Sequence, residues 1–422
     1  MSISNHARTL LATAILTGLS PLAAAADWAG GITPKISYTG EGASLLDGGK
    51  DKGSAYSGQL FLGADADFDK LFGWSGASMH LGISSRHGQN LAAKNIGNST
   101  SVQEIYGGQG ERLANLTLEQ KFLDGRIDIE GGRTVANIHF LGSDLCAYFQ
   151  DNSACGNPTF VFRTSNFTWW PVSSWGAHAK FWFTPTVYLH VGAYEDNNAQ
   201  QADGEHGLNW HKDHLGYIMP YAIGYKTTAD TARLPAMYEI GGWKDNTTYA
   251  DPLKDAHGQP ALLSGEKYAT LQGRSGVYFR FEQQVTRPDP GSTRGLILFG
   301  SAFKGTSGQL IEDHYFSFGL VQKGTFDSRP DDNIAFVVTQ QHYSGNALKN
   351  LRIARALAGG TGTPPSSMTM MELSYGIQVT RNFRLAPNLH YIIHPDQFAE
   401  PARLRNLDNA LVAGLRIDWV LL

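Results

Sequence analysis

Residues 114–130, ANLTLEQKFLDGRIDIE, decide the fold class of this 422-residue chain. Apolar residues alternate with polar or charged ones on both sides of the dipeptide Asp124-Gly125. A period of two predicts a β-strand with one apolar and one polar face. Asp-Gly readily adopts the backbone conformations of a tight turn, so the stretch predicts a β-hairpin.

The same alternation recurs along most of the remaining chain. The clearest runs cover residues 57–68, 76–86, 177–183, 187–194, 277–282, 315–320, 371–380 and 413–421. Counting all such runs predicts about sixteen strands, and no convincing long amphipathic helix interrupts them. No break in composition marks a second domain, so we expect residues 27–422 to form one all-β domain.

Three features favour a transmembrane antiparallel β-barrel over a soluble sandwich or propeller. Full charges occupy mid-strand positions on the polar faces, as a water-filled lumen permits. Aromatic residues gather where strands are expected to end, at 167–171 and at Trp74, and resemble the girdles at membrane interfaces. An alternating strand occupies the C-terminus, where an even-stranded barrel closes. We therefore predict a barrel of about sixteen strands around an aqueous channel.

The N-terminus has the composition of a secretory signal. Arg8 precedes an apolar stretch at 10–19, and Ala24-Ala25-Ala26 supplies the small residues of a cleavage site. We expect residues 1–26 to be removed as a signal peptide on export; a membrane anchor is the alternative. Export would place the two cysteines, Cys146 and Cys155, in an oxidising compartment, which favours a disulfide over two unrelated thiols.

Composition excludes several classes of function. The net charge is only −4 and no basic tract occurs, so we expect no nucleic-acid partner. With 11% aromatic and 17% charged residues, the chain does not resemble a disordered protein. His211 and His214 have a metal-like spacing but no matching cluster, so we predict no metal site and no cofactor.

Short motifs along nearly the whole mature chain resemble one family. They include Ser85-Arg86-His87-Gly88, Val102-Gln103-Glu104-Ile105-Tyr106-Gly107, Cys155-Gly156-Asn157-Pro158, Val191-Gly192-Ala193-Tyr194-Glu195 and Arg329-Pro330-Asp331-Asp332. In this order and spacing the chain resembles the OprB-type carbohydrate-selective porins of Gram-negative outer membranes.

The resemblance implies a 16-stranded barrel that passes sugars passively down their gradient. Arg86 and Glu104 resemble the arginine and glutamate that meet at the narrowest point of such a channel. The third long loop, roughly 133–158, is implied to fold inward and to narrow the pore. Arg133 at its start is assigned to the same constriction, and the pair Cys146 and Cys155 resembles the disulfide of the family.

Physical chemistry supports this choice of side chains, because sugars are neutral and carry hydroxyl groups around apolar C–H faces. Arginine offers five donors and glutamate two acceptor oxygens, and the opposite charges cancel. Binding must also stay weak enough for the solute to leave. Further candidates for the lumen lining are His80, Lys121, Glu130, Tyr148, Lys180, Arg280 and Glu282.

The sequence thus predicts an outer-membrane porin for passive diffusion of mono- and oligosaccharides, without a catalytic step. The expected partners are carbohydrate solutes, outer-membrane lipid and the outer-membrane assembly machinery, and the chain is expected to be a monomer or a homotrimer. An exported all-β carbohydrate-active enzyme or lectin is an alternative of a different class. A general porin without sugar preference is the second alternative.

Overall fold

Sixteen antiparallel strands form one closed barrel, which confirms the predicted fold class. The computed structural model describes residues 30–155, 157–210, 215–289 and 291–422, without the side chains of 155 and 157–159. The predicted signal peptide, residues 1–26, and the pair His211 and His214 lie outside the described residues. The strands are β1 (Ile32–Gly49), β2 (Ser54–Asp67), β3 (Ala77–Gly88), β4 (Gly110–Phe122), β5 (Ile127–Thr134), β6 (Ser174–Trp182), β7 (Val187–Asp196), β8 (Gly216–Lys226), β9 (Ala236–Asp255), β10 (Tyr268–Gln284), β11 (Gly295–Ser307), β12 (Glu312–Lys323), β13 (Asn333–Tyr343), β14 (Ser367–Thr380), β15 (Phe383–Ile393) and β16 (Asp408–Val420).

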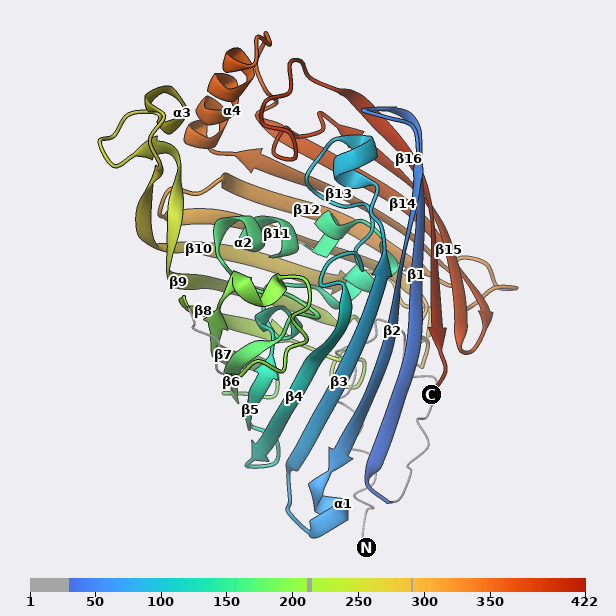
Figure 1. Ribbon diagram of the computed structural model, residues 1–422. Coiled ribbons are helices and arrows are strands. Elements are labelled where there is room, and N and C mark those ends of the chain that lie inside the picture. Colours follow the sequence, from blue (N-terminus) through green and yellow to red (C-terminus); the bar gives the residue numbers. More distant parts are fainter. Residues whose placement is uncertain (1–29, 156, 211–214, 290) are drawn as a thin grey trace, which may run out of the picture.

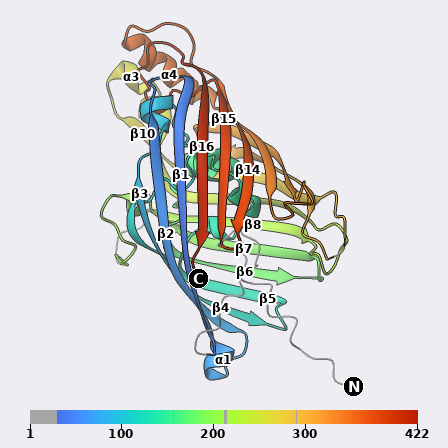
Figure 2. The same cartoon turned by 90° about the vertical axis from the view of Figure 1, so that its right-hand side faces the viewer.

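Each strand pairs with its neighbours in sequence, and β1 pairs with β16 to close the sheet. Figure 2 looks onto this seam, where the first and last strands lie side by side. The backbone amides of Leu421 and Leu422 both donate to the carbonyl of Ile36, so pairing continues to the end of the chain. Closure leaves no strand edge unpaired, which a sheet surrounded by lipid requires.

The short helices lie in the connections between strands. They are α1 (Phe68–Phe72), the π-helix η1 (Ala92–Ile96), the 3₁₀ helices η2 (Ala136–Ile138), η3 (Asp144–Tyr148), η4 (Asn152–Cys155) and η5 (Asn198–Gln201), and the helices α2 (Asn157–Thr164), α3 (Ala261–Ser264) and α4 (Gly345–Leu357). None of the helices among the described residues is long and apolar enough to cross a membrane. The connections that contain α3 and α4 lie at one end of the barrel, and the C-terminus lies at the other (Figure 1).

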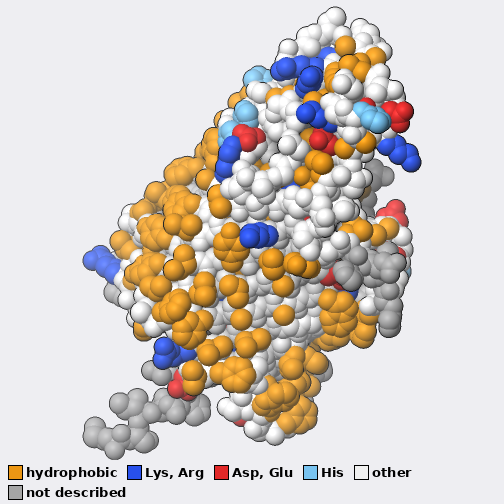
Figure 3. Space-filling model, turned by 90° about the vertical axis from the view of Figure 1, so that its left-hand side faces the viewer, with side chains coloured by type: hydrophobic (Ala, Val, Ile, Leu, Met, Phe, Trp, Pro, Cys, Tyr) orange, Lys and Arg blue, Asp and Glu red, His pale blue; other side chains and the backbone are white. Residues whose placement is uncertain are grey.

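The alternation in the sequence sorts side chains between the two faces of the sheet. On β12, Phe316 and Phe318 are 41% and 45% exposed, whereas Tyr315, the residue directly before Phe316, is buried. Ile240 on β9 is 62% exposed, and its neighbour Glu239 is buried. Figure 3 shows hydrophobic side chains spread over the middle and lower part of one outer face, where charged side chains are sparse. This outer surface matches the apolar band of a transmembrane barrel.

One part of the aromatic prediction is wrong. Phe167 is 1% exposed in a cluster inside the barrel, and Trp170 lines an internal cavity. Residues 167–171 therefore belong to an inward-folded segment rather than to a girdle at the membrane interface. Trp74 is 49% exposed in the connection between β2 and β3, as the prediction of a rim position requires.

Aromatic packing inside the barrel depends on one glycine. Trp243 on β9 is fully buried, and its cross-strand partner on β10 is Gly276. A Cβ atom at Gly276 would overlap the Trp243 indole, which packs against Phe160 and Phe303. The glycine thus makes room for a large ring that fills the lumen side of the sheet.

We predict that Gly276→Ala displaces the Trp243 ring and destabilises the barrel by about 1–3 kcal/mol, because overpacking forces side chains from their preferred rotamers. The temperature at which the detergent-solubilised barrel loses its compact, fast-migrating form on an unboiled gel measures the loss. Gly345→Ala is the matched control, because Gly345 is exposed at the start of α4 with open space at its Cβ position. Equal transition temperatures for the two variants would contradict this explanation of the packing.

Candidate functional site in the channel lumen

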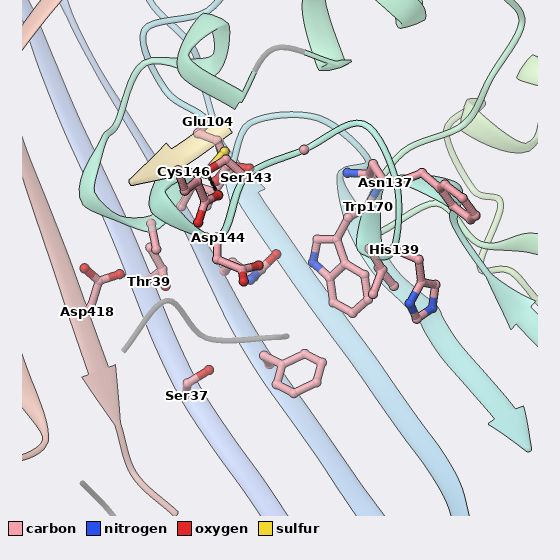
Figure 4. Close-up of a pocket in the computed structure, with 18 of the residues that line it drawn as sticks. Ser37, Thr39, Glu104, Asn137, His139, Ser143, Asp144, Cys146, Trp170 and Asp418 are labelled. Atoms are coloured by element: carbon pink, nitrogen blue, oxygen red, sulfur yellow. Dashed lines mark hydrogen bonds between the residues drawn. The ribbon is translucent and has the colours of Figure 1, made fainter. Parts of the chain in front are cut away.

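A cavity of about 370 Å³ lies inside the barrel, between its wall and two inward-folded segments. The wall of the cavity comes from β1 to β3, β5 to β10, β15 and β16. The inward segments are residues 89–109, between β3 and β4, which we call loop L2, and residues 135–173, between β5 and β6, which we call loop L3. Figure 4 shows Glu104 of L2 above Ser143 and Asp144 of L3, with Thr39 and Asp418 on the facing strands.

Loop L3 lies within the barrel because apolar side chains on both partners pack together. Phe140, Phe160 and Phe167 of L3 form one buried cluster with inward-facing residues of β7 to β12. Leu145 and Phe149 belong to a second cluster with residues of β11 to β13. These contacts fill part of the lumen, and the cavity occupies space that they leave open.

Polar contacts satisfy the backbone of L3, because a buried amide without a partner costs free energy. The amides of Gln150 and Asp151 donate to the Glu372 carboxylate on β14, at 3.0 and 2.7 Å. The guanidinium groups of Arg384 and Arg416 donate to the carbonyls of Ala147 and Phe149, at 2.6 and 3.0 Å. A buried carboxylate and two arginines on the barrel wall therefore hold residues 147–151 of L3 in place.

Loop L2 is held by a glutamine and a glutamate. The Gln103 side-chain amide donates to the Glu41 carbonyl at 2.9 Å and accepts from the Leu91 amide at 2.9 Å. The Glu104 amide donates to the Gln150 carbonyl at 2.8 Å, and the Ile105 amide donates to the Glu41 carboxylate at 3.1 Å. These contacts place the Glu104 side chain where L2 and L3 meet, with 30% of it exposed.

The structure brings Glu104 near an arginine that the sequence reasoning did not select. Arg416 on β16 approaches Glu104 to 3.9 Å and also pairs with Glu41 at 2.8 Å and Asp418 at 3.0 Å. Arg86 lines the same cavity, but it donates to Gln59 at 2.6 Å and to the Gly107 carbonyl at 2.9 Å. Among the described residues, no ion pair within 4.0 Å joins Arg86 to Glu104.

The opposite wall of the cavity carries a second set of paired charges. Arg280 donates to Glu239 at 2.8 Å, and the Tyr188 and Tyr278 hydroxyls donate to the same carboxylate. The Lys180 ammonium lies 4.0 Å from the centre of the Tyr188 ring. Glu282 accepts a hydrogen bond of 2.6 Å from Ser143 of L3. The predicted residues Lys180, Arg280 and Glu282 thus all line the cavity, together with Arg86 and Glu104.

Five other predicted residues lie elsewhere. Arg133 is five positions from the cavity residue Asp128 on β5, so it lies on the opposite face of the strand, beside Glu195 and Trp175. Tyr148 is buried, with Lys323 and Arg384 above its ring. The remaining three lie on the inner wall and do not themselves line this cavity: His80 pairs with Asp65, Lys121 with Glu119, and Glu130 with His178, which does line it.

Cys146 lines the cavity and is disulfide-bonded. The side chain of Cys155, its predicted partner, lies outside the described residues. The residues missed by sequence reasoning are Arg384, Arg416 and Trp170. Arg416 could have been found, because it stands on the polar face of an alternating strand, but nothing local indicated how near Glu104 it lies.

The family model for the "Carbohydrate-selective porin, OprB family" matches residues 51–421. The chain is 31% identical over 417 residues to Porin B of Pseudomonas aeruginosa, covering 93% of this chain and 90% of that protein. It is 27% identical over 400 residues to a putative porin, QuiX, of Acinetobacter baylyi, covering 90% and 87%. The solved high-pH structure of Pseudomonas putida OprB superposes with a TM-score of 0.84 at 32% identity, covering 93% of this chain and 94% of that one. Salmonella typhi OmpF, at 10% identity and a TM-score of 0.56, shares the fold.

The buried Asp151 of L3 leads to a prediction about how the stability of the barrel depends on pH. One carboxylate oxygen accepts the Ser153 amide at 2.8 Å, the other is buried without a hydrogen-bond partner among the described residues, and burial raises the pKa of Asp151 to about 7. A carboxyl group whose pKa is raised by folding stabilises the folded state while protonated, and this contribution is lost as the pH rises from about 4 to about 7.

We therefore expect Asp151→Asn to stabilise the barrel at pH 8 by about 1–3 kcal/mol, because the buried charge disappears. The gain should shrink at pH 5, where the wild-type carboxyl is protonated. Thermal unfolding of the detergent-solubilised barrel at both pH values measures the difference. Asp144→Asn in the same loop is the control, because Asp144 is exposed. A gain independent of pH would contradict the assignment of the buried charge.

Proposed function

This chain belongs to the OprB family of carbohydrate-selective porins, and we propose how its channel favours sugars. The protein is a β-barrel porin of the Gram-negative outer membrane for carbohydrate solutes, and its family and fold are those of a channel rather than an enzyme. In our proposal sugars diffuse passively through the cavity between L3 and the opposite wall, and no catalytic step occurs. Arg86, Glu104 and Arg416 make the selective contacts.

The near balance of charge around the cavity carries this proposal. Its lining includes six arginine or lysine side chains and five carboxylates. Several of the cations are paired at close range, such as Arg384 with Asp418 at 2.7 Å and Arg416 with Glu41 at 2.8 Å. A wall whose positive and negative charges nearly balance attracts ions of either sign weakly, yet it still presents donors and acceptors to hydroxyl groups.

Two groups that line the cavity retain hydrogen-bonding capacity. Arg86 uses Nε and Nη1 for contacts within the protein, while its Nη2 makes no hydrogen bond to the described residues. Glu104 lies 3.9 Å from Arg416, which is beyond hydrogen-bond length. A sugar hydroxyl can therefore donate to Glu104 while a neighbouring hydroxyl accepts from Arg86.

Aromatic rings supply a surface for the C–H faces of a sugar. Trp170 of L3 and Phe61 of β2 both line the cavity, with ring centres 5.8 Å apart. Stacking on such rings and a few hydrogen bonds give weak, non-covalent contacts, which suit a channel because the solute must also leave.

The rest of the proposal concerns export and assembly. We infer that residues 1–26 are cleaved after Ala26, that residues 27–422 form one barrel domain, and that Cys146 and Cys155 are joined within L3. Contact with outer-membrane lipid and passage through the outer-membrane assembly machinery follow from the same localisation. A monomer and a homotrimer are both compatible with this barrel.

We predict that Arg86→Ala and Glu104→Gln each weaken the block of ion current by sugar roughly tenfold, since each removes a charge-assisted hydrogen bond. The measurement is single-channel conductance in a planar bilayer, titrated with a series of mono- and disaccharides. Lys121→Ala is the control, because it removes one positive charge from the inner wall outside the cavity lining.

Two outcomes would contradict the proposal. If no sugar blocks the wild-type channel in a concentration-dependent way, the chain acts as a general porin under these conditions. If sugars block the wild type and the block is unchanged in both variants, selection occurs but Arg86 and Glu104 do not provide it.

A further inference from the structure

A cluster of one glutamate and three histidines on the inner wall plays no part in the proposed contacts with sugar. Glu130 lies on β5, His178 on β6 and His190 on β7, and His139 lies in the first part of L3. We propose that Glu130, His139 and His178 bind a divalent transition-metal ion of the zinc type. Imidazole and carboxylate are ligands that such ions accept.

The distances between the candidate ligand atoms fit a tetrahedral ion. Glu130 Oε2 lies 3.3 Å from His178 Nε2 and 3.5 Å from His139 Nε2, and all three ligand atoms lie within 4.8 Å of one another. With metal–ligand bonds of about 2.0–2.1 Å, neighbouring ligands of a tetrahedral ion lie about 3.3–3.4 Å apart. The carboxylate therefore already stands at ligand distance from both imidazoles.

His139 provides an independent sign that something binds here. Its side chain is 8% exposed, and its Nε2 atom has no hydrogen-bond partner among the described residues although Glu130 Oε2 is 3.5 Å away. Buried polar atoms are almost always paired, so an unpaired one needs an explanation. A cation between Nε2 and the carboxylate supplies the missing partner.

The groups behind the ligands have the arrangement that metal sites use. Glu130 Oε1 accepts a hydrogen bond of 2.5 Å from Thr117, which fixes the carboxylate. His178 Nδ1 lies 3.1 Å from His190 Nε2. A metal-bound histidine usually donates its other ring N–H to a neighbour, so His178 would donate to His190. The His190 ring is itself held by stacking on Phe140, with centres 3.8 Å apart.

The cavity gives the ion a path of entry and a fourth ligand. His139, His178 and His190 all line it, so solvent in the lumen can reach the cluster. Two histidines, one glutamate and a water molecule complete a four-coordinate site. The ion would tie β5 and β6 to the start of L3. Asn137, two residues before His139, accepts a hydrogen bond of 3.1 Å from the Trp170 amide. A metal bound at His139 would therefore also stabilise the C-terminal part of L3, which contains Trp170.

Cobalt provides the test, because Co²⁺ replaces Zn²⁺ and absorbs visible light strongly when tetrahedral. The full barrel is purified in detergent, stripped with a chelator and titrated with Co²⁺ at pH 8, where the ligands are deprotonated. The half-buried group of Asp313, His314 and His342 could also hold an ion. The titration therefore uses a background with His314→Gln and His342→Gln.

We expect one equivalent of Co²⁺ with a tetrahedral spectrum that Zn²⁺ displaces, and a higher unfolding temperature with either ion. His139→Gln and Glu130→Gln should each weaken Co²⁺ binding by about 100-fold or more, since loss of an outer-shell partner alone costs 10- to 100-fold. His80→Gln, which changes a wall histidine paired with Asp65, should leave binding unchanged.

The proposal is overturned if the background protein, shown to be folded by its mobility on an unboiled gel, gives no tetrahedral cobalt spectrum. This result depends on no variant of the proposed ligands, so a folding defect in those variants cannot hide it. Undiminished binding in folded His139→Gln would also overturn the proposal.

Discussion

Lipid offers no hydrogen-bond partner to a peptide group, and the arrangement of this protein depends on how the chain meets that constraint. The sheet meets it by closing, with β1 paired to β16 over eleven positions that run from Ser37↔Val420 to Gly49↔Asp408. Closure sends every second side chain inward, so the polar face of each strand surrounds water. The parts of the loops that are buried against the wall face the same requirement, and the buried carboxylates of Glu41 and Glu372 accept their amides.

The same constraint shapes the chemistry of the channel. Charged side chains that point inward are partly shielded from water, so pairing with an opposite charge stabilises them. Glu239 accepts from an arginine and two tyrosines, and Asp418 accepts from Arg384 and Arg416. Pairing for stability leaves a lumen that is rich in donors and acceptors but nearly balanced in charge. A neutral solute with many hydroxyl groups is the class that such a lumen suits.

The sequence predicted the features that depend on neighbours along the chain. Residues 114–130 form the hairpin of β4 and β5, and the outward Phe316 and Phe318 follow from alternation on β12. The cavity positions of Arg280 and Glu282 follow from the same rule on β10. Alternation gives the face of a residue but neither its height in the barrel nor the path of a loop.

Most features that the sequence did not indicate depend on the height of a residue in the barrel or on the path of a loop. Glu104 meets Arg416 more than 300 positions away because L2 and the last strand face the same part of the lumen. Arg133 is an odd number of positions from Asp128, so alternation itself excludes it from the channel side of β5, and it is buried beside Trp175. Residues 167–171 read as a girdle only while L3 is assumed to lie outside the barrel. The cluster of Glu130, His139 and His178 has no motif, because its members come from three separate elements.

The most direct test of the central claim is the efflux of three solutes of matched size from liposomes that contain the purified protein, at neutral pH and low salt. The solutes are neutral glucose, anionic gluconate and cationic glucosamine. Because positive and negative side chains of the cavity lining nearly balance and several of them are paired, glucose should leave several-fold faster than either ion. If gluconate or glucosamine leaves as fast as glucose, or faster, the lumen selects by size or by charge, and balanced charges do not explain its preference for sugars.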